Sequence, residues 1–101
     1  MTTINKAVHI GDLSEATTVT VSDVACNLIA VYINETISAH TVDIQDNGTL
    51  LFKIPASAVE GTTYDFKRSR FNVNLECIMN ASATGSITVI IEPLAQAGTN
   101  L

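Results

Sequence analysis

Two histidines and two cysteines are the side chains of this chain that could serve as nucleophiles, general bases or soft metal ligands: His9, His40, Cys26 and Cys77. A Cys–His pair needs an exposed, activated thiol, but both cysteines sit among apolar neighbours, which predicts buried and reduced thiols. No serine lies in a Gly-x-Ser-x-Gly elbow. We therefore predict that the protein is not an enzyme and has no catalytic residue. The sequence leaves open whether Cys26 and Cys77 lie close together.

One short segment partly matches the residue pattern of a calcium-binding loop. Asp43 and Asp46 are followed by Asn47 and Gly48, but the later acidic ligand of such a loop is missing, because residues 49–55 contain no acid. A hairpin turn explains the same residues. His9 could bind a metal together with Asp12 or with His40, but neither pair has the sequence spacing of a known metal site. The sequence therefore predicts no metal site and no cofactor.

Three of the five lysines and arginines fall within residues 67–70, Lys-Arg-Ser-Arg. One interpretation is a solvated corner between two strands. The other is a contact surface, because arginine forms two-pronged contacts with carboxylates and suits subunit interfaces. On the second interpretation Lys67, Arg68 and Arg70 are the candidate partner interface, facing an acidic partner or a neighbouring copy of this acidic protein.

The composition also restricts the other classes of partner that the protein could bind. The chain has 101 residues, 10 acidic and 5 basic residues, and a net charge of −5, so it lacks the cationic surface of a non-specific nucleic-acid binder. No apolar run reaches the ~18 residues of a membrane span. The first residues lack the plan of a secretory signal, and Met1 favours a protein that is made in the cytoplasm and not exported. We predict neither a nucleic-acid nor a membrane partner.

The segments that must position these side chains have the pattern of short β-strands. Apolar and polar residues alternate between turn residues, and no segment keeps helical periodicity for three turns; one-turn helical stretches are predicted only at residues 12–16 and 55–60. The Asp-Asn-Gly run at residues 46–48 is the strongest hairpin turn. Strands are predicted at residues 7–10, 17–22, 27–33, 39–45, 49–54, 63–66, 70–79 and 86–92.

Three of these strands carry detailed expectations. Residues 27–33 are apolar on both faces, which predicts a central strand or one whose outer face meets a partner. Residues 70–79 form the longest predicted strand. In residues 49–54, Leu50, Phe52 and Ile54 are expected to lie on one face of the strand.

Together these strands predict an all-β fold, an antiparallel β-sandwich or jelly-roll-like barrel of seven to eight short strands. We expect one sandwich domain over residues 1–101, with flexible ends near residues 1–5 and 94–101.

The second half of the chain carries a resemblance. Residues 60–71 read Glu-Gly-Thr-Thr-Tyr-Asp-Phe-Lys-Arg-Ser-Arg-Phe, and residues 83–93 read Ala-Thr-Gly-Ser-Ile-Thr-Val-Ile-Ile-Glu-Pro. The Gly-x-x-Tyr-x-Phe turn, the Arg-Phe pair and the closing strand resemble small virion accessory proteins of tailed bacteriophages, of the head decoration or cement type. The resemblance covers residues 60–93 and rests on short, permissive motifs.

The resemblance implies a non-enzymatic structural protein located in the virion and made in the host cytoplasm. It implies homo-oligomers, often trimers, seated on the major capsid protein and stabilising its lattice. The alternative is a stand-alone carbohydrate-binding or surface-binding module of a tail fibre or adhesin. The low aromatic content, with no Trp and two Tyr, weakens the sugar-binding alternative, because pyranose rings usually stack on aromatic side chains.

Overall fold

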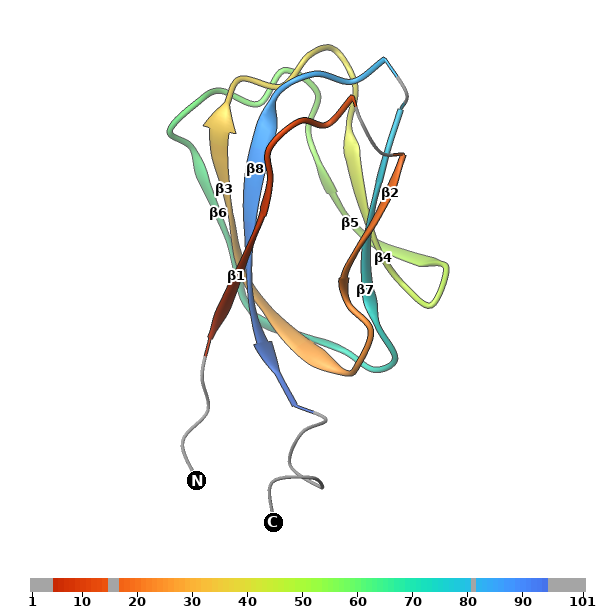
Figure 1. Cartoon of the computed structure of the whole chain (residues 1–101). Coiled ribbons are helices and arrows are strands. Elements are labelled where there is room, and N and C mark those ends of the chain that lie inside the picture. Colours follow the sequence, from red (N-terminus) through yellow and green to blue (C-terminus); the bar gives the residue numbers. More distant parts are fainter. Residues whose placement is uncertain (1–4, 15–16, 81, 95–101) are drawn as a thin grey trace.

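The computed structural model describes residues 5–14, 17–80 and 82–94, which form a sandwich of two antiparallel four-stranded sheets (Figure 1). One sheet has the order β1-β8-β3-β6 and the other β2-β7-β4-β5. The strands are β1 (Lys6–Ile10), β2 (Thr18–Ser22), β3 (Cys26–Glu35), β4 (Val42–Asp46), β5 (Thr49–Ile54), β6 (Thr63–Phe71), β7 (Leu75–Met79) and β8 (Ser86–Pro93).

The strand pairing is that of one long hairpin rolled up on itself. β4 pairs with β5, β3 with β6, β2 with β7 and β1 with β8, so each strand of the first half has its partner in the second half. Two further ladders, β3 with β8 and β4 with β7, join the four pairs into two sheets. This is the topology of an eight-stranded jelly roll. The predicted all-β sandwich of seven to eight strands is confirmed.

The core lies between the sheets, where the inward residues of each strand meet. β3 is a central strand, as predicted, with Leu28, Val31 and Ile33 fully buried. The open side between edge strands β5 and β6 is filled by aromatic rings: the ring centroids of Phe52 and Phe66 lie 4.8 Å apart. A fully buried apolar side chain, such as that of Leu28, contributes about 1.5–3 kcal/mol to stability.

The loops at one end of the roll form a plug, which we call the loop plug. Four loops each bury one apolar residue there: Leu13, Ile37, Ala58 and Ala83. Backbone hydrogen bonds join these loops to one another, including Leu13 N–H to the Gly85 carbonyl at 3.0 Å and Ile37 N–H to the Ala58 carbonyl at 2.9 Å. The end of the core is thereby closed without a helix or an extra strand.

The predicted turn at residues 46–48 is confirmed as the tip of the β4–β5 hairpin. Asn47 and Gly48 both have positive φ, 50° and 84°, as a two-residue primed turn requires. The expectation that Leu50 shares a face with Phe52 and Ile54 is wrong. The β4–β5 pairing shifts register between Ile44 and Gln45, which pair with Phe52 and Leu50, and this irregularity leaves Leu50 45% exposed and Leu51 42% exposed.

The predicted long strand at residues 70–79 is also wrong. The chain leaves the first sheet after Phe71 and enters the second at Leu75, so the alternating run is split between β6 and β7. Val73, which the alternation places on the same face as Phe71 and Leu75, is 49% exposed in the connecting loop. Asp46 fixes this break, because its carboxylate accepts hydrogen bonds from three successive backbone N–H groups, those of Asn72, Val73 and Asn74.

The remaining predictions concern loops and chain ends. Residues 55–60 form turns instead of the predicted helical turn, and residues 12–14 also form a turn, while 15–16 lie outside the described residues. The strand predicted at residues 39–45 begins three residues later, at Val42. The predicted flexible ends lie outside the described residues, except for residues 5 and 94.

Candidate partner interface

The basic segment at residues 67–70 lies inside β6, and not at a corner between two strands. Lys67 and Arg68 have positive φ, 55° and 61°, and form a bulge. The ladder to β3 shows the bulge as a register shift, since Leu28 pairs with Ser69 but Ala30 pairs with Asp65. The bulge is stabilised by the Asp65 carboxylate, which accepts the Lys67 N–H at 2.8 Å.

The bulge places Arg68 over a buried carboxylate. Arg68 Nη2 lies 2.5 Å from Oε1 of Glu92, and the side chains are 63% and 5% exposed. Asn27 Nδ2 donates to the same oxygen at 2.8 Å. A buried carboxylate needs such donors, because removing a charge from water is costly unless it is paired and hydrogen-bonded. Arg68 therefore has a partner within its own chain.

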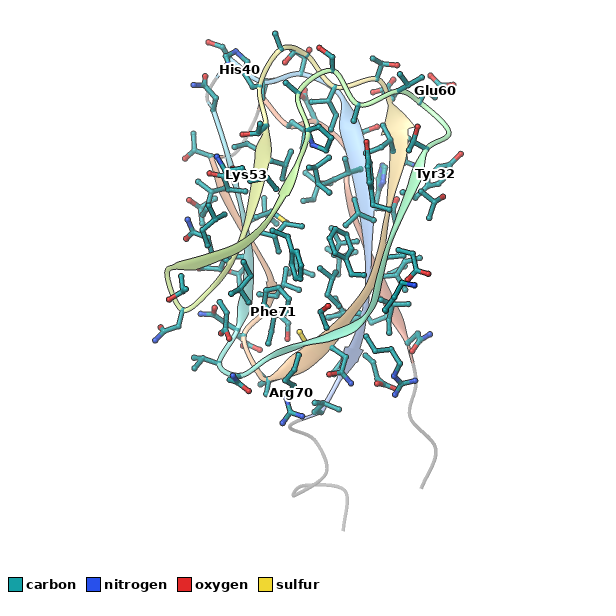
Figure 2. All side chains as sticks on the ribbon, turned by 180° about the vertical axis from the view of Figure 1, so that it is seen from behind. Tyr32, His40, Lys53, Glu60, Arg70 and Phe71 are labelled. Atoms are coloured by element: carbon teal, nitrogen blue, oxygen red, sulfur yellow. The ribbon has the colours of Figure 1, made fainter. Side chains whose placement is uncertain are left out.

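Lys67 and Arg70 are both exposed. Arg70 pairs with Asn27 across the ladder, next to the buried pair Cys26 and Phe71, so its side chain points to the outer face of the sheet. Figure 2 shows Arg70 at the end of the sandwich opposite Glu60 and the loop plug. In the described residues the ion pairs are Arg68–Glu92 and Lys53–Asp43. Of the three predicted interface residues, Arg68 thus makes a contact within its own chain, whereas Lys67 and Arg70 are exposed cations.

The outer face of this sheet continues from the cations into a surface with an apolar middle and the exposed Asp65 at its β6 edge. Ala30 pairs with Ile90, and Ile90 pairs with Ala7, so apolar side chains occupy its middle. The next row contains Tyr32, which is 38% exposed and paired with Thr88. Figure 2 shows the Tyr32 side chain directed away from the core. Residues 27–33 were predicted to be apolar on both faces. Their side chains contribute to the core on one face and to this outer surface on the other.

The predicted positions of the histidines and cysteines can now be compared with the structure. Nδ1 of His9 lies 3.1 Å from Oγ1 of Thr88. Because the Thr88 hydroxyl donates to Oδ1 of Asn34 at 2.6 Å, it accepts from His9, and Nδ1 of His9 carries the proton. His40 lies in the β3–β4 loop. Nowhere in residues 5–14, 17–80 and 82–94 do three His, Cys, Asp or Glu side chains gather as a metal site would require.

Both thiols are free and buried, which confirms that prediction. Burial raises the pKa of Cys77 to about 12. Burial also raises the pKa of Cys26, against a smaller opposing effect of its hydrogen bond with Ser22. The thiolate is the reactive form of cysteine, so both residues are inert small hydrophobic groups at neutral pH.

Asp46, the central residue of the calcium-like run, is committed to the backbone of the β6–β7 loop. Partial desolvation opposes ionisation, but the hydrogen bonds from Asn72, Asn74 and Val73 outweigh it and lower the pKa of Asp46 below the ordinary value of 3.8. The folded protein thus favours the charged carboxylate. This contribution to stability is present above the ordinary pKa and is lost as the pH falls through the lower, folded-state value.

The Asp46→Asn variant tests this role. We expect its free energy of unfolding to be about 1–2 kcal/mol lower than that of the native chain near neutral pH, because a charged acceptor of three N–H groups is lost. The difference should shrink as the pH falls below 3.8, where the native carboxyl also takes up a proton. Urea unfolding at about pH 7 and about pH 2 measures both values. A difference that does not change with pH would contradict the assignment.

A shallow groove lies on the other side of the sandwich, where edge strands β1 and β2 face each other. Its volume is about 520 Å³. Its walls come from the start of β1, the end of β2 and the end of β8, and combine apolar and polar side chains. The lining residues are Lys6, Thr20, Val21, Ser22, Asp23, Val24, Ile91 and Pro93.

Comparisons with protein-family models, with curated proteins and with solved structures found no match to this chain. Among the described residues there is no helix with the length and apolar character that crossing a membrane requires.

Sequence reasoning missed Glu92 as a member of the site. Its position at the end of an alternating strand gave no sign of burial, since Ile91 before it is the inward residue. Only the pairing of β8 with β3, together with the bulge in β6, brings Asn27 and Arg68 to it. The sequence carried no signal for this contact, because Arg68 and Glu92 lie 24 residues apart in the chain.

Proposed function

We propose that this protein is a non-enzymatic structural protein of a phage virion, a capsid decoration or cement protein that stabilises the major capsid lattice. The observation that carries the proposal is the β6 bulge, which holds two residues in a left-handed conformation and leaves Lys67 and Arg70 exposed. Such backbone strain costs about 1–3 kcal/mol per residue and persists where the surrounding structure enforces it, often at functional positions. Jelly-roll sandwiches are also common in viral capsid and lectin domains, although a fold alone does not define a function.

The outer face next to these cations fits attachment to a large protein surface. Its middle is formed by Ala7, Ala30 and Ile90, and charge is concentrated at its border. Interfaces typically have such a charge-poor centre and a polar rim that orients the partner. An acidic patch on the capsid lattice would pair with Lys67 and Arg70, because arginine binds carboxylates with two parallel hydrogen bonds.

Co-sedimentation with capsids that lack their decoration protein tests the proposal. We expect Lys67→Glu and Arg70→Glu each to weaken attachment by about tenfold or more, because a carboxylate would then face an acidic patch. Lys53→Glu is the matched control, since it makes the same charge change on the other sheet and should bind like the native chain. Equal loss with Lys53→Glu would indicate a general charge effect and contradict the proposed contact.

A second candidate function is a carbohydrate-binding or surface-binding module of a tail fibre or adhesin. The row around Tyr32 favours it, because an exposed aromatic ring lies beside the hydrogen-bonding groups of Thr88, His9 and Asn34. Aromatic faces pack against apolar surfaces while the flanking polar groups supply direction. Glycan binding that depends on Tyr32, together with failure to bind capsids, would favour this candidate over the first.

A further inference from the structure

One row of side chains, which we call the polar row, crosses all four strands on the outer face of the sheet β1-β8-β3-β6. The strand pairing places His9 beside Thr88, Thr88 beside Tyr32, and Tyr32 beside Thr63. Asn34, two residues after Tyr32 on β3, joins the row through the Thr88 hydroxyl. The chain neighbours of Tyr32 and Thr88 are buried in the core, so these side chains point outward. Because neighbouring strands lie about 4.8 Å apart, the row is roughly 14 Å long.

The hydrogen bonds within the polar row determine which polar groups remain for a ligand. Nδ1 of His9 donates to the Thr88 hydroxyl at 3.1 Å, and this hydroxyl donates to Oδ1 of Asn34 at 2.6 Å. These bonds use the His9 N–H and the Asn34 carbonyl oxygen. In the neutral imidazole Nε2 is then an acceptor, and Nδ2 of Asn34 keeps two N–H donors. The row therefore offers an acceptor over β1 and a donor over β3.

The space beside Nε2 of His9 is open because residue 11 is a glycine. A Cβ added at Gly11 would lie 3.5 Å from Nε2 and 3.7 Å from Cδ2 of His9. Backbone conformation does not require this glycine, since the glycines with positive φ are Gly48, Gly61 and Gly85. Gly11 thus leaves free the position from which a hydroxyl group of a ligand would reach Nε2.

The chemistry of the polar row fits a neutral, polyhydroxylated ligand. None of its five side chains is charged, and the cations of this face, Lys67 and Arg70, lie beyond Asp65 on β6. Phosphate groups and acidic peptides need cations, which the row does not offer. The exposed ring of Tyr32 can pack against the apolar face of a sugar ring. Sugar hydroxyls both donate and accept, so they satisfy the free acceptor and the free donor together.

We propose that the polar row binds a short neutral oligosaccharide, with one sugar ring packed on Tyr32 and one hydroxyl donating to Nε2 of His9. A second hydroxyl accepts from Nδ2 of Asn34. The inference rests on the carbohydrate-binding candidate described above and deepens it, because it names the ligand class and the recognition contacts. The row is longer than a single sugar ring, which favours an oligosaccharide. An apolar row separates it from the row of Arg70, so sugar binding and capsid attachment can be tested separately.

An array of neutral oligosaccharides of glucose, galactose, mannose and N-acetylglucosamine selects the probe, and NMR titration with the best-bound oligosaccharide compares the variants. We expect Tyr32→Ala to weaken binding at least ~10-fold, because the ring that packs on the sugar is lost. Gly11→Ala should weaken binding about fivefold or more, because its methyl group covers Nε2 of His9. Leu51→Ala is the matched control, since it removes an exposed apolar side chain from the other sheet and should bind like the native chain. Circular dichroism verifies the fold of each variant.

His9→Phe keeps an aromatic ring but removes Nε2, and it completes a double-mutant cycle with Gly11→Ala. In the His9→Phe background, Gly11→Ala should cause no further loss of affinity, because both changes remove the same hydrogen bond. Independent, additive losses would overturn the His9 contact.

The outcomes separate this inference from the functions on which it bears. Binding that depends on Tyr32 but not on Gly11 would reject the His9 contact and keep the carbohydrate-binding candidate. Failure to bind any oligosaccharide of the array would overturn both. Because no capsid is present, neither result depends on the capsid-binding test.

Discussion

Replacing Gly85 with alanine should lower the free energy of unfolding by about 3 kcal/mol or more. Gly85 lies in the loop plug with φ of +112°, a conformation that residues with a side chain rarely adopt. An added Cβ would lie 2.9 Å from the Thr36 carbonyl oxygen and 3.0 Å from Cα of Ile37. Both neighbours are backbone atoms, so the clash can be relieved only by moving a loop that helps to close the core.

Gly61→Ala separates backbone strain from this clash. Gly61 also has a positive φ, +89°, but nothing lies within 4 Å of an added Cβ. We expect Gly61→Ala to cost about 1–2 kcal/mol, which is the cost of a left-handed conformation. Urea unfolding followed by circular dichroism compares the two variants. Equal losses would show that the loop plug shifts to accommodate the methyl group, and would contradict a rigid closure.

Removal of the Arg68 side chain should have the second largest effect. The Glu92 side chain is 5% exposed in the native chain, and Arg68→Ala leaves its carboxylate with Asn27 as the remaining donor. Breaking a fully buried pair costs about 3–5 kcal/mol. Arg68 is itself 63% exposed, so solvent screens the pair and we expect about 2 kcal/mol.

Lys67→Ala is the matched control for this loss. Lys67 has nearly the same positive φ as Arg68, 55° against 61°, so both alanine variants keep the same backbone strain. Lys67 is exposed, and its replacement should change stability by less than about 0.5 kcal/mol. The difference between the two variants in urea unfolding therefore isolates the Glu92 contact. If the two losses agree within error, Arg68 contributes nothing through Glu92.

The fold class could be predicted because its determinants are local. Alternation along residues 86–92 separates Ile87, Val89 and Ile91 from the residues between them, and these three are the ones buried in the core. The Asn47-Gly48 turn follows from the tolerance of these residues for positive φ.

The change of sheet between Phe71 and Leu75 could not be predicted in this way. Inward and outward positions alternate on both sides of the break, so the sequence pattern runs through it without interruption. The determinant is the carboxylate of Asp46, which comes from 26 to 28 residues earlier in the chain. Local periodicity carries no information on such a contact.

The sequence identified the basic residues of the candidate interface, but not how the structure arranges them. The cluster of cations was visible, but its division into the internal Arg68 and the outward Lys67 and Arg70 depends on the bulge. Residues with side chains rarely adopt left-handed conformations, and neither Lys67 nor Arg68 signals one. The exposure of Leu50 was missed for a similar reason, because a register shift turns Leu50 outward in an otherwise regular alternation.

The rolled-hairpin pairing also determines when this chain can fold during its synthesis. β8 lies between β1 and β3 in its sheet, so the sheet has a gap at its centre until Ser86–Pro93 has left the ribosome. The β4–β5 hairpin is local and can form early, but each later pair joins strands farther apart in the chain, which makes folding slow. Folding is therefore expected to complete only once β8 has been synthesised, and the shorter nascent chain exposes two apolar sheet faces until then.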